Sequence, residues 1–391
     1  MRAPSSLLAV VAVAANLRPS ITVVGPLIGL IGTDLALGPG TLGLLGAAPL
    51  VAFAVVSPLV HLPVSRWGAD RVVFVATLSL LLGVVLRSLP GGQLTLWVGT
   101  ALLGASIGVV NVAVPAILKR EFAAEVPLVT GVYSAVLTGS AAVASGLAVP
   151  IAAPYGWRVA LAVWGVLSVV AALVWLPRLR RRIPGPPAPD RLTTAGAQPR
   201  GPSMWSSAVA WQVTAFMATQ ATTFYLLVTW LPSIEVSRGV SPATAGWHLF
   251  LYQLVGIPAG LLVTLFMRRR ADHRLVGVAV STVVLVAAAG LLLVPSWLVA
   301  WVVLAGLGGG SSLVVALALV GERVRTSAGA AQLSGMVQSI GYLLAIAGPI
   351  GAGLLFRATG GWAATLVAVG AVALLQLVVA LFAGRPRFTH R

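Results

Sequence analysis

The residues of this chain that can do chemistry are few, and the most informative of them is Arg18. It lies in the stretch AANLRPSITVVGP, residues 14–26, in the middle of a run that otherwise reads as membrane-spanning. A guanidinium at that depth costs at least about 2.5 to 3.5 kcal/mol to insert. All eight acidic residues fall in predicted loops or at the ends of predicted spans, so no carboxylate is available to neutralise it. We expect Arg18 to face a water-filled cavity, where its planar fork can bind the anionic part of a solute through two hydrogen bonds.

The proline that follows Arg18 belongs to the same argument. Pro19 cannot donate to the helix ladder and frees a carbonyl near residue 15, so the helix should kink or open there. An opened helix can present Asn16, Arg18 and Ser20 to one cavity. The alternative is that the freed carbonyl and Asn16 together satisfy the arginine. We favour binding, because a charge inside a membrane is functional by default.

Other polar side chains inside the predicted spans are candidates to line the same cavity. Gln338 and Tyr342 are four residues apart and so share a helix face. For each candidate the alternative is a hydrogen bond between helices, worth about 0.6 kcal/mol on average. The remaining candidates for contact with a substrate are Asn111, Tyr133, Thr223, Tyr225 and Gln253.

Metal and nucleophile chemistry have no residues to support them. The chain has four scattered histidines and no cysteine. A metal centre needs several such ligands close together, and covalent catalysis needs an activated nucleophile. We therefore expect no metal, no cofactor and no enzymatic activity.

The elements that must position these residues are transmembrane helices. Hydrophobic residues make up 59% of the chain and charged residues only 8%, with a mean hydropathy of +1.01. A soluble domain is normally about a quarter charged. Runs of roughly 20 apolar residues, each able to cross about 30 Å of hydrocarbon, recur along the chain. We predict an all-α membrane protein with twelve spans near residues 5–31, 41–64, 72–89, 94–118, 128–152, 158–177, 207–231, 242–267, 275–295, 298–320, 328–356 and 362–383.

The two halves of the chain resemble each other in sequence. TGVYSA, residues 130–135, matches SGMVQS, residues 334–339, and GWRVALAVWG, residues 156–165, matches GWAATLVAVG, residues 361–370. Duplicated six-helix halves are typical of transporters, with the substrate site near the bilayer midplane between them. We predict two pseudo-symmetric six-helix bundles at residues 1–177 and 207–384, a basic, Pro-rich linker at 178–206 and a tail at 385–391.

The distribution of charge predicts the orientation. Of the 25 basic residues, twenty fall in segments on the side of the termini, four (Arg87, Arg158, Arg238 and Arg357) on the other side, and Arg18 between them. Lys and Arg accumulate in cytoplasmic loops, so we expect both termini and the linker to be cytoplasmic in a cell membrane. The net charge of +17 then reflects topology and anionic lipid. Basic residues spread over short loops argue against nucleic-acid binding. The expected partners are the bilayer and a small-molecule substrate, with the chain as a monomer.

Several motifs resemble a known family. Twelve spans, a basic central loop and RWGADR, residues 66–71, resemble the major facilitator superfamily. Within it, NLRPSITVVGPL, NVAVPAILKREF, FYLLVTWLP and LSGMVQSIGYLLAIAGP resemble the cyanate and 2-nitroimidazole permease branch. One departure concerns the loop after the second span, where Ser65 replaces the usual acidic residue and His61 the opening glycine.

That resemblance implies a charged gate at the cytoplasmic face. Asp70 and its counterpart Asp272 could pair there with basic residues, and the candidates are Arg66, Arg71 and Arg274. The alternative is that all five are solvated loop charges.

Three functions agree with the sequence. The leading one is alternating-access transport of a small anionic or polar solute, such as a cyanate-like anion, bound by Arg18. The second is export of a drug or toxicant of the nitroimidazole type on the same fold, which needs a larger, more aromatic cavity. The third is a membrane sensor without transport, against which the lack of an appended soluble domain argues.

The charge bias makes a topological prediction. A reporter that is active only in the cytoplasm should be active when fused within residues 178–206 and inactive when fused after the seventh span, at Ser237. An external position of the 178–206 segment would overturn the predicted orientation.

Overall fold

The structure, a computed structural model, describes residues 4–122, 126–179, 203–268, 271–325 and 327–389. Within these ranges the chain is helical and contains no strand. Most of the predicted linker, residues 180–202, lies outside the described residues.

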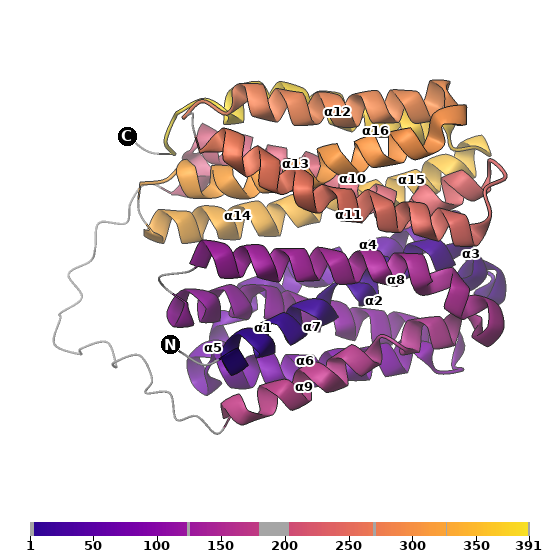
Figure 1. The fold of residues 1–391 in the computed structure, drawn as a ribbon, viewed down its shortest axis with the longest axis horizontal. Coiled ribbons are helices and arrows are strands. Elements are labelled where there is room, and N and C mark those ends of the chain that lie inside the picture. The colour runs from indigo at the N-terminus through magenta and orange to yellow at the C-terminus, as the bar shows by residue number, and fades with distance from the viewer. Residues whose placement is uncertain (1–3, 123–125, 180–202, 269–270, 326, 390–391) are drawn as a thin grey trace.

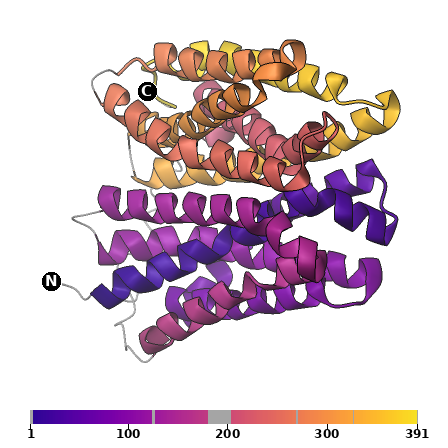
Figure 2. The same cartoon turned by 45° about the vertical axis from the view of Figure 1, so that its right-hand side comes forward.

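The helices form two stacked groups, indigo to magenta and red to yellow in Figure 1, and the same division is visible after the 45° turn of Figure 2. The first half contains α1 (Pro4–Leu17), α2 (Pro19–Thr22), α3 (Val24–Leu35), α4 (Pro39–Val56), α5 (His61–Trp67), α6 (Ala69–Ser88), α7 (Gly92–Glu121), α8 (Val126–Ala162) and α9 (Gly165–Leu179). The second contains α10 (Ala208–Val236), α11 (Pro242–Met267), α12 (Arg274–Leu293), α13 (Leu298–Glu322), α14 (Ser327–Ala345), α15 (Ala347–Thr359) and α16 (Ala363–Ala383).

The predicted twelve-helix membrane fold is confirmed. Among the described helices, nine stretches are long and apolar enough to cross a membrane, or ten if the bent pair Ser6–Thr22 and Val24–Leu35 forms one span. One stretch, Leu128–Leu179, has 52 residues and holds two crossings, because Gly156 at φ 82° turns the chain back on itself. Helix α10, interrupted by threonines and glutamines, supplies the remaining crossing.

The first span is broken twice. Arg18 separates α1 from α2, and Pro19 occupies the first position of α2, where a missing N–H does no harm. The chain then bends by 43° between Ser6–Thr22 and Val24–Leu35. Pro26 explains this bend, since it cannot donate to the carbonyl of Thr22. That carbonyl instead accepts a hydrogen bond of 3.4 Å from the Ser145 hydroxyl of α8.

The two ends of the molecule differ in how the halves meet. We call the end that carries residues 179 and 203 the linker face, and the opposite end, where α3 meets α4 and α10 meets α11, the far face (Figure 1). Near the far face the halves touch backbone to backbone. A Cβ added to Gly25 would lie 2.1 Å from the Val228 carbonyl oxygen, and one added to Gly353 would lie 2.2 Å from that of Pro39.

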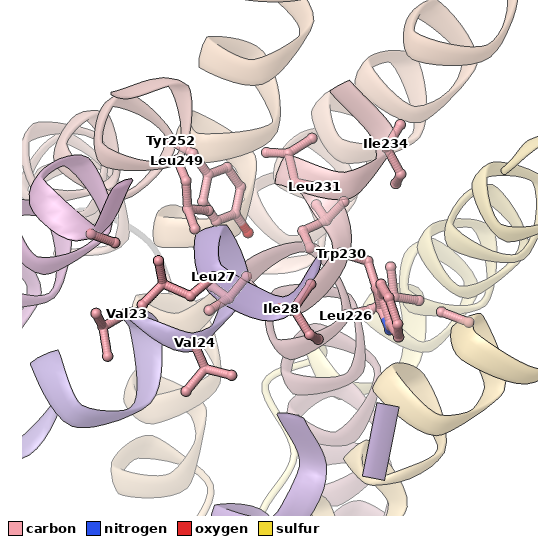
Figure 3. Packing of buried hydrophobic residues seen from close by; sticks show 14 of the residues in the cluster. Val23, Val24, Leu27, Ile28, Leu226, Trp230, Leu231, Ile234, Leu249 and Tyr252 are labelled. Carbon is pink, nitrogen blue, oxygen red and sulfur yellow. The ribbon is translucent and has the colours of Figure 1, made fainter. Parts of the chain in front are cut away.

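An apolar cluster fills the space around this contact. Figure 3 shows α3 beside α10 and α11, with Val24, Leu27 and Ile28 of the helix near the labelled side chains of the second half. Leu27, Leu231, Ile234 and Leu249 are all fully buried. Close-packed apolar contact of this kind holds the far face closed.

The Gly25 contact yields a prediction with a matched control. Gly25→Ala should open the far face, because the new Cβ cannot approach the Val228 carbonyl at 2.1 Å. Gly29→Ala, on the same helix with nothing within 4 Å, should leave it closed. In the cysteine-free chain, spin labels at Leu94→Cys and Leu293→Cys, both exposed near the far face, should report a longer-distance population only in Gly25→Ala. Identical distance distributions in the two variants would contradict this account.

Candidate functional site

Arg18 occupies the break in the first span and reaches toward the other half. Its side chain is half-buried, and its guanidinium carbon lies 5.1 Å from the centre of the Phe224 ring of α10. A cation over an aromatic face is attracted by the negative charge above the ring. Within the described part of the chain, the guanidinium makes no hydrogen bond and no ion pair. Its donors are therefore available to a ligand.

Aromatic rings from both halves surround this position. Phe224 contacts Tyr225 and Tyr252, with ring centroids 5.2 and 6.2 Å apart. Tyr342 contacts Tyr225 at 6.3 Å and Phe53 of α4 at 5.7 Å. We call these five residues the aromatic cluster. Because Phe53 belongs to one half and the other four residues to the second, relative movement of the halves changes the shape of the cluster.

Tyrosine is scarce in this chain, and its distribution is informative. The sequence has five tyrosines, and four of them (Tyr133, Tyr225, Tyr252 and Tyr342) lie within electrostatic range of Arg18. Tyr133, Tyr225 and Tyr342 were predicted candidates. Tyr252 and Phe224 were missed, although the placing of four of five tyrosines inside spans was a readable signal.

The other predicted substrate contacts fall in different places. Asn16 turns away from Arg18, since its side-chain oxygen accepts a hydrogen bond of 2.9 Å from Ser168 of α9. Gln253 bridges the halves, with its amide nitrogen 2.8 Å from the Ser145 hydroxyl. Gln338 donates within its own helix to Ser334.

Three further candidates have no hydrogen-bond partner for their polar side-chain atoms among the described residues. Thr223 and Ser20 are buried with unpartnered hydroxyls, and Asn111 is half-buried in α7. Of these, Ser20 lies in a small cavity that the second half also lines. The structure thus gathers Arg18, three predicted tyrosines and two unpredicted aromatic residues, and it spreads the remaining candidates around them.

A cluster of charges ties three helix ends together at the linker face. Arg178 and Arg120 each lie 2.8 Å from a carboxylate oxygen of Asp70, and both also pair with Glu121. The Trp175 indole donates to the Asp70 carbonyl at 2.9 Å. Burial alone would raise the pKa of Glu121, but hydrogen bonds and charge from the two arginines hold it below its usual range.

The remaining predicted gate residues are less connected. Arg66 and Arg71 are exposed and make no ion pair with the described residues. Asp272 pairs with Arg274 at 2.6 Å on the surface of the second half. Hydrogen bonds from Arg274 lower the pKa of Asp272 to about 2. Every ion pair in the described ranges joins two groups of the same half.

The second half carries a buried acid that sequence position alone did not reveal. Glu235 is fully buried at the end of α10, and its carboxylate lies 2.7 Å from Nδ1 of His248. His248 also lines an open cavity of about 540 Å³ near the far face, with Arg238 and Pro295. The sequence placed Glu235 at a span end, where exposure is the usual expectation.

Two bundles of membrane-spanning helices, with a cation that has no partner among the described residues and an aromatic cluster between them, form the arrangement expected of a transporter. A model of the Major Facilitator Superfamily matches residues 10–345. The chain is 36% identical to a 2-nitroimidazole transporter of Escherichia coli, over 96% of this chain and 94% of that protein. The chain belongs to the major facilitator superfamily and, within it, to the branch of the 2-nitroimidazole and cyanate transporters.

Further relatives and a solved structure agree with this assignment. The chain is 37% identical to an uncharacterized transporter of Bacillus subtilis, over 97% of this chain and 93% of that protein. It is 28% identical to a cyanate transport protein of Escherichia coli, over 91% of each. A bacterial homologue of the human lysosomal transporter Spinster, solved inward-facing and unoccupied, shares the fold with a TM-score of 0.82 at 15% identity, over 99% and 98% of the two chains.

The linker-face charge cluster makes a stability prediction. Arg178→Met should lower the free energy of unfolding by about 3 kcal/mol, because it leaves the buried Asp70 and the half-buried Glu121 short of a cation. Since the folded pKa of Glu121 lies below 4.5, the stabilisation is present above that pH and is lost as the pH falls through the folded value. Thermal unfolding in detergent should therefore show a smaller acid-dependent loss in Arg178→Met than in the wild type. Arg71→Met, at an exposed arginine that forms no ion pair with the described residues, is the control, and an equal effect of both changes would contradict the prediction.

Proposed function

We propose that this chain carries a small planar solute with an anionic or nitro group across the cell membrane by alternating access, and that Arg18 binds that group. The observation that carries the proposal is the free guanidinium of Arg18 within the aromatic cluster of both halves. In this position one ligand can contact both bundles, as alternating access requires.

The hydrogen bonds around Arg18 support a binding role over a structural one. A structural arginine would be satisfied by Asn16 and by carbonyls of the broken helix. Asn16 accepts from Ser168 instead, and the Arg18 guanidinium donates to no carbonyl of the described residues. The guanidinium keeps its paired donors, which match two oxygens of a carboxylate or nitro group.

The aromatic cluster favours a flat solute over a linear one. Aromatic faces stack on planar rings at centroid separations of about 4.5 to 7 Å, and they give little to a three-atom anion. A relative transports 2-nitroimidazole, which combines a flat ring with two partly negative oxygens. We therefore place nitroaromatic or aromatic acid solutes ahead of cyanate-like anions, although another relative is a cyanate transport protein.

Orientation and gating complete the proposal. The charge bias supports a cytoplasmic linker face, so closure of the far face corresponds to a state open to the cytoplasm. Asp70, Asp272, Arg66, Arg71 and Arg274 would act when the linker face closes, with Arg120, Glu121 and Arg178 holding Asp70 in place.

Binding measurements on purified protein test the role of Arg18. The wild type and Arg18→Ala are titrated with 2-nitroimidazole, benzoate and cyanate. Arg18→Ala should bind the solute with an affinity at least about tenfold lower than that of the wild type, equivalent to about 1.4 kcal/mol. Arg18→Lys should recover part of it, because a point charge cannot reproduce the bidentate fork. Arg357→Ala, at an exposed arginine near the far face, should bind as the wild type does.

A second variant separates flat from linear solutes. Phe224→Leu keeps an apolar side chain but removes the ring beneath Arg18. It should weaken binding of 2-nitroimidazole and benzoate more than that of cyanate. Unchanged affinity in a folded Arg18→Ala protein would remove the proposed role of the arginine, and equal losses for all three solutes in Phe224→Leu would remove the preference for flat ones.

A further inference from the structure

A second arginine is buried in the membrane-spanning part of the molecule. Charge counting places Arg87 with the outer segments, but the structure turns it inward at the end of α6, with 1% of its surface exposed. One terminal nitrogen donates a hydrogen bond of 2.6 Å to the carbonyl of Ser20. The Nε atom and the other terminal nitrogen have no partner among the described residues, and Arg87 forms no ion pair there.

A small cavity adjoins the Arg87 side chain. Its volume is about 10 Å³, which is about the space of one water-sized species and excludes an organic solute. Arg87, Ser20 and Thr100 line it. The hydroxyls of Ser20 and Thr100, 1% and 3% exposed, also lack partners.

The chemistry of the cavity is unusual for a protein interior. Buried polar groups are almost always hydrogen-bonded, and each exception calls for an explanation. Here three residues that line one space carry two guanidinium nitrogens and two hydroxyls without a partner, and the positive charge has no counter-charge in the described residues. Removal of a cation from water without a partner is strongly unfavourable. A single small anion would accept from all of these donors and neutralise the charge.

We propose that Arg87, Ser20 and Thr100 form a binding site for a small monovalent inorganic anion of the chloride class. The site differs from the solute position at Arg18, although Tyr225 borders both, and it does not depend on the identity of that solute. Ser20 connects the two, because its carbonyl is held by Arg87 and it follows the helix break directly.

The position of the cavity gives the anion a conformational effect. Tyr225 and Thr229 of α10 form its wall from the second half, and Thr229 packs against Gly46 of α4. An anion there contacts both halves beside the closed far face, and opening of that face would draw the two walls apart. It should therefore stabilise the closed far face, by preferential binding to that state.

Halide-dependent stability of the full-length purified protein tests the site. Thermal unfolding is followed while sodium chloride replaces sodium gluconate at constant ionic strength. The wild type should show a saturable rise of the unfolding temperature with chloride. Arg87→Met should abolish that rise, and Thr100→Val, which keeps the arginine, should shift half-saturation to at least about tenfold higher chloride, as expected for loss of 1.4 kcal/mol.

Controls separate this site from the solute site and from salt effects in general. Arg357→Met, at an exposed arginine, and Arg18→Ala should both respond to chloride as the wild type does. Should Arg87→Met fail to fold, Thr100→Val and Ser20→Ala decide the matter, because each removes one donor from the cavity. Equal responses to chloride and gluconate in the wild type, or wild-type half-saturation in Thr100→Val and Ser20→Ala, would overturn the proposal. Loss of the chloride response in Arg18→Ala alone would assign the anion to the solute position instead.

Discussion

Positive charge inside an apolar bundle, with no carboxylate of its own, is the constraint on which this structure depends. Arg18 and Arg87 both lie within membrane-spanning helices, and neither pairs with an acidic residue in the part of the chain that the structure describes. Each charge is stabilised by one contact that uses only part of its hydrogen-bonding capacity or none of it. Arg18 lies over an aromatic face, and Arg87 donates to a carbonyl. A ligand that supplies negative charge or hydrogen-bond acceptors would therefore lower the free energy of each cation.

The broken first span is what brings these charges to the interface. Pro19 and Pro26 interrupt hydrogen bonding on either side of α2, so that Arg18 and Ser20 lie beside the second half. Gly25 then permits α3 to touch α10 along the backbone, which a side chain would prevent. A local interruption, costly in an isolated helix, is offset by the packing of two bundles.

The sequence predicts the fold well because a membrane permits few kinds of backbone structure. Every backbone group must be paired within its own helix, so apolar length alone identifies the spans. Arg18 could be found because a charge in such a run has no ordinary explanation. Arg87 was harder to interpret, since a basic residue near a span end normally reaches water, and only packing of α2 and α4 turns it inward.

The linker-face charge cluster could not be predicted from the sequence, for another reason. Arg120, Glu121 and Arg178 read as loop charges, and their meeting depends on the relative lengths and angles of three helices. The same holds for Asn16, whose neighbour Ser168 is distant in the chain. The aromatic cluster lies between these cases, because the tyrosines are visible in the sequence but their convergence is not.

The confinement of ion pairs to single halves has a mechanical consequence. A movement of one bundle against the other would break no described salt bridge. It would separate apolar surfaces and glycine backbones, together with the hydrogen bond from Gln253 to Ser145. Mobile ions screen charge but leave dispersion unaffected. Added salt should therefore have little direct effect on the contacts between the halves, whereas it weakens the exposed ion pairs within each half.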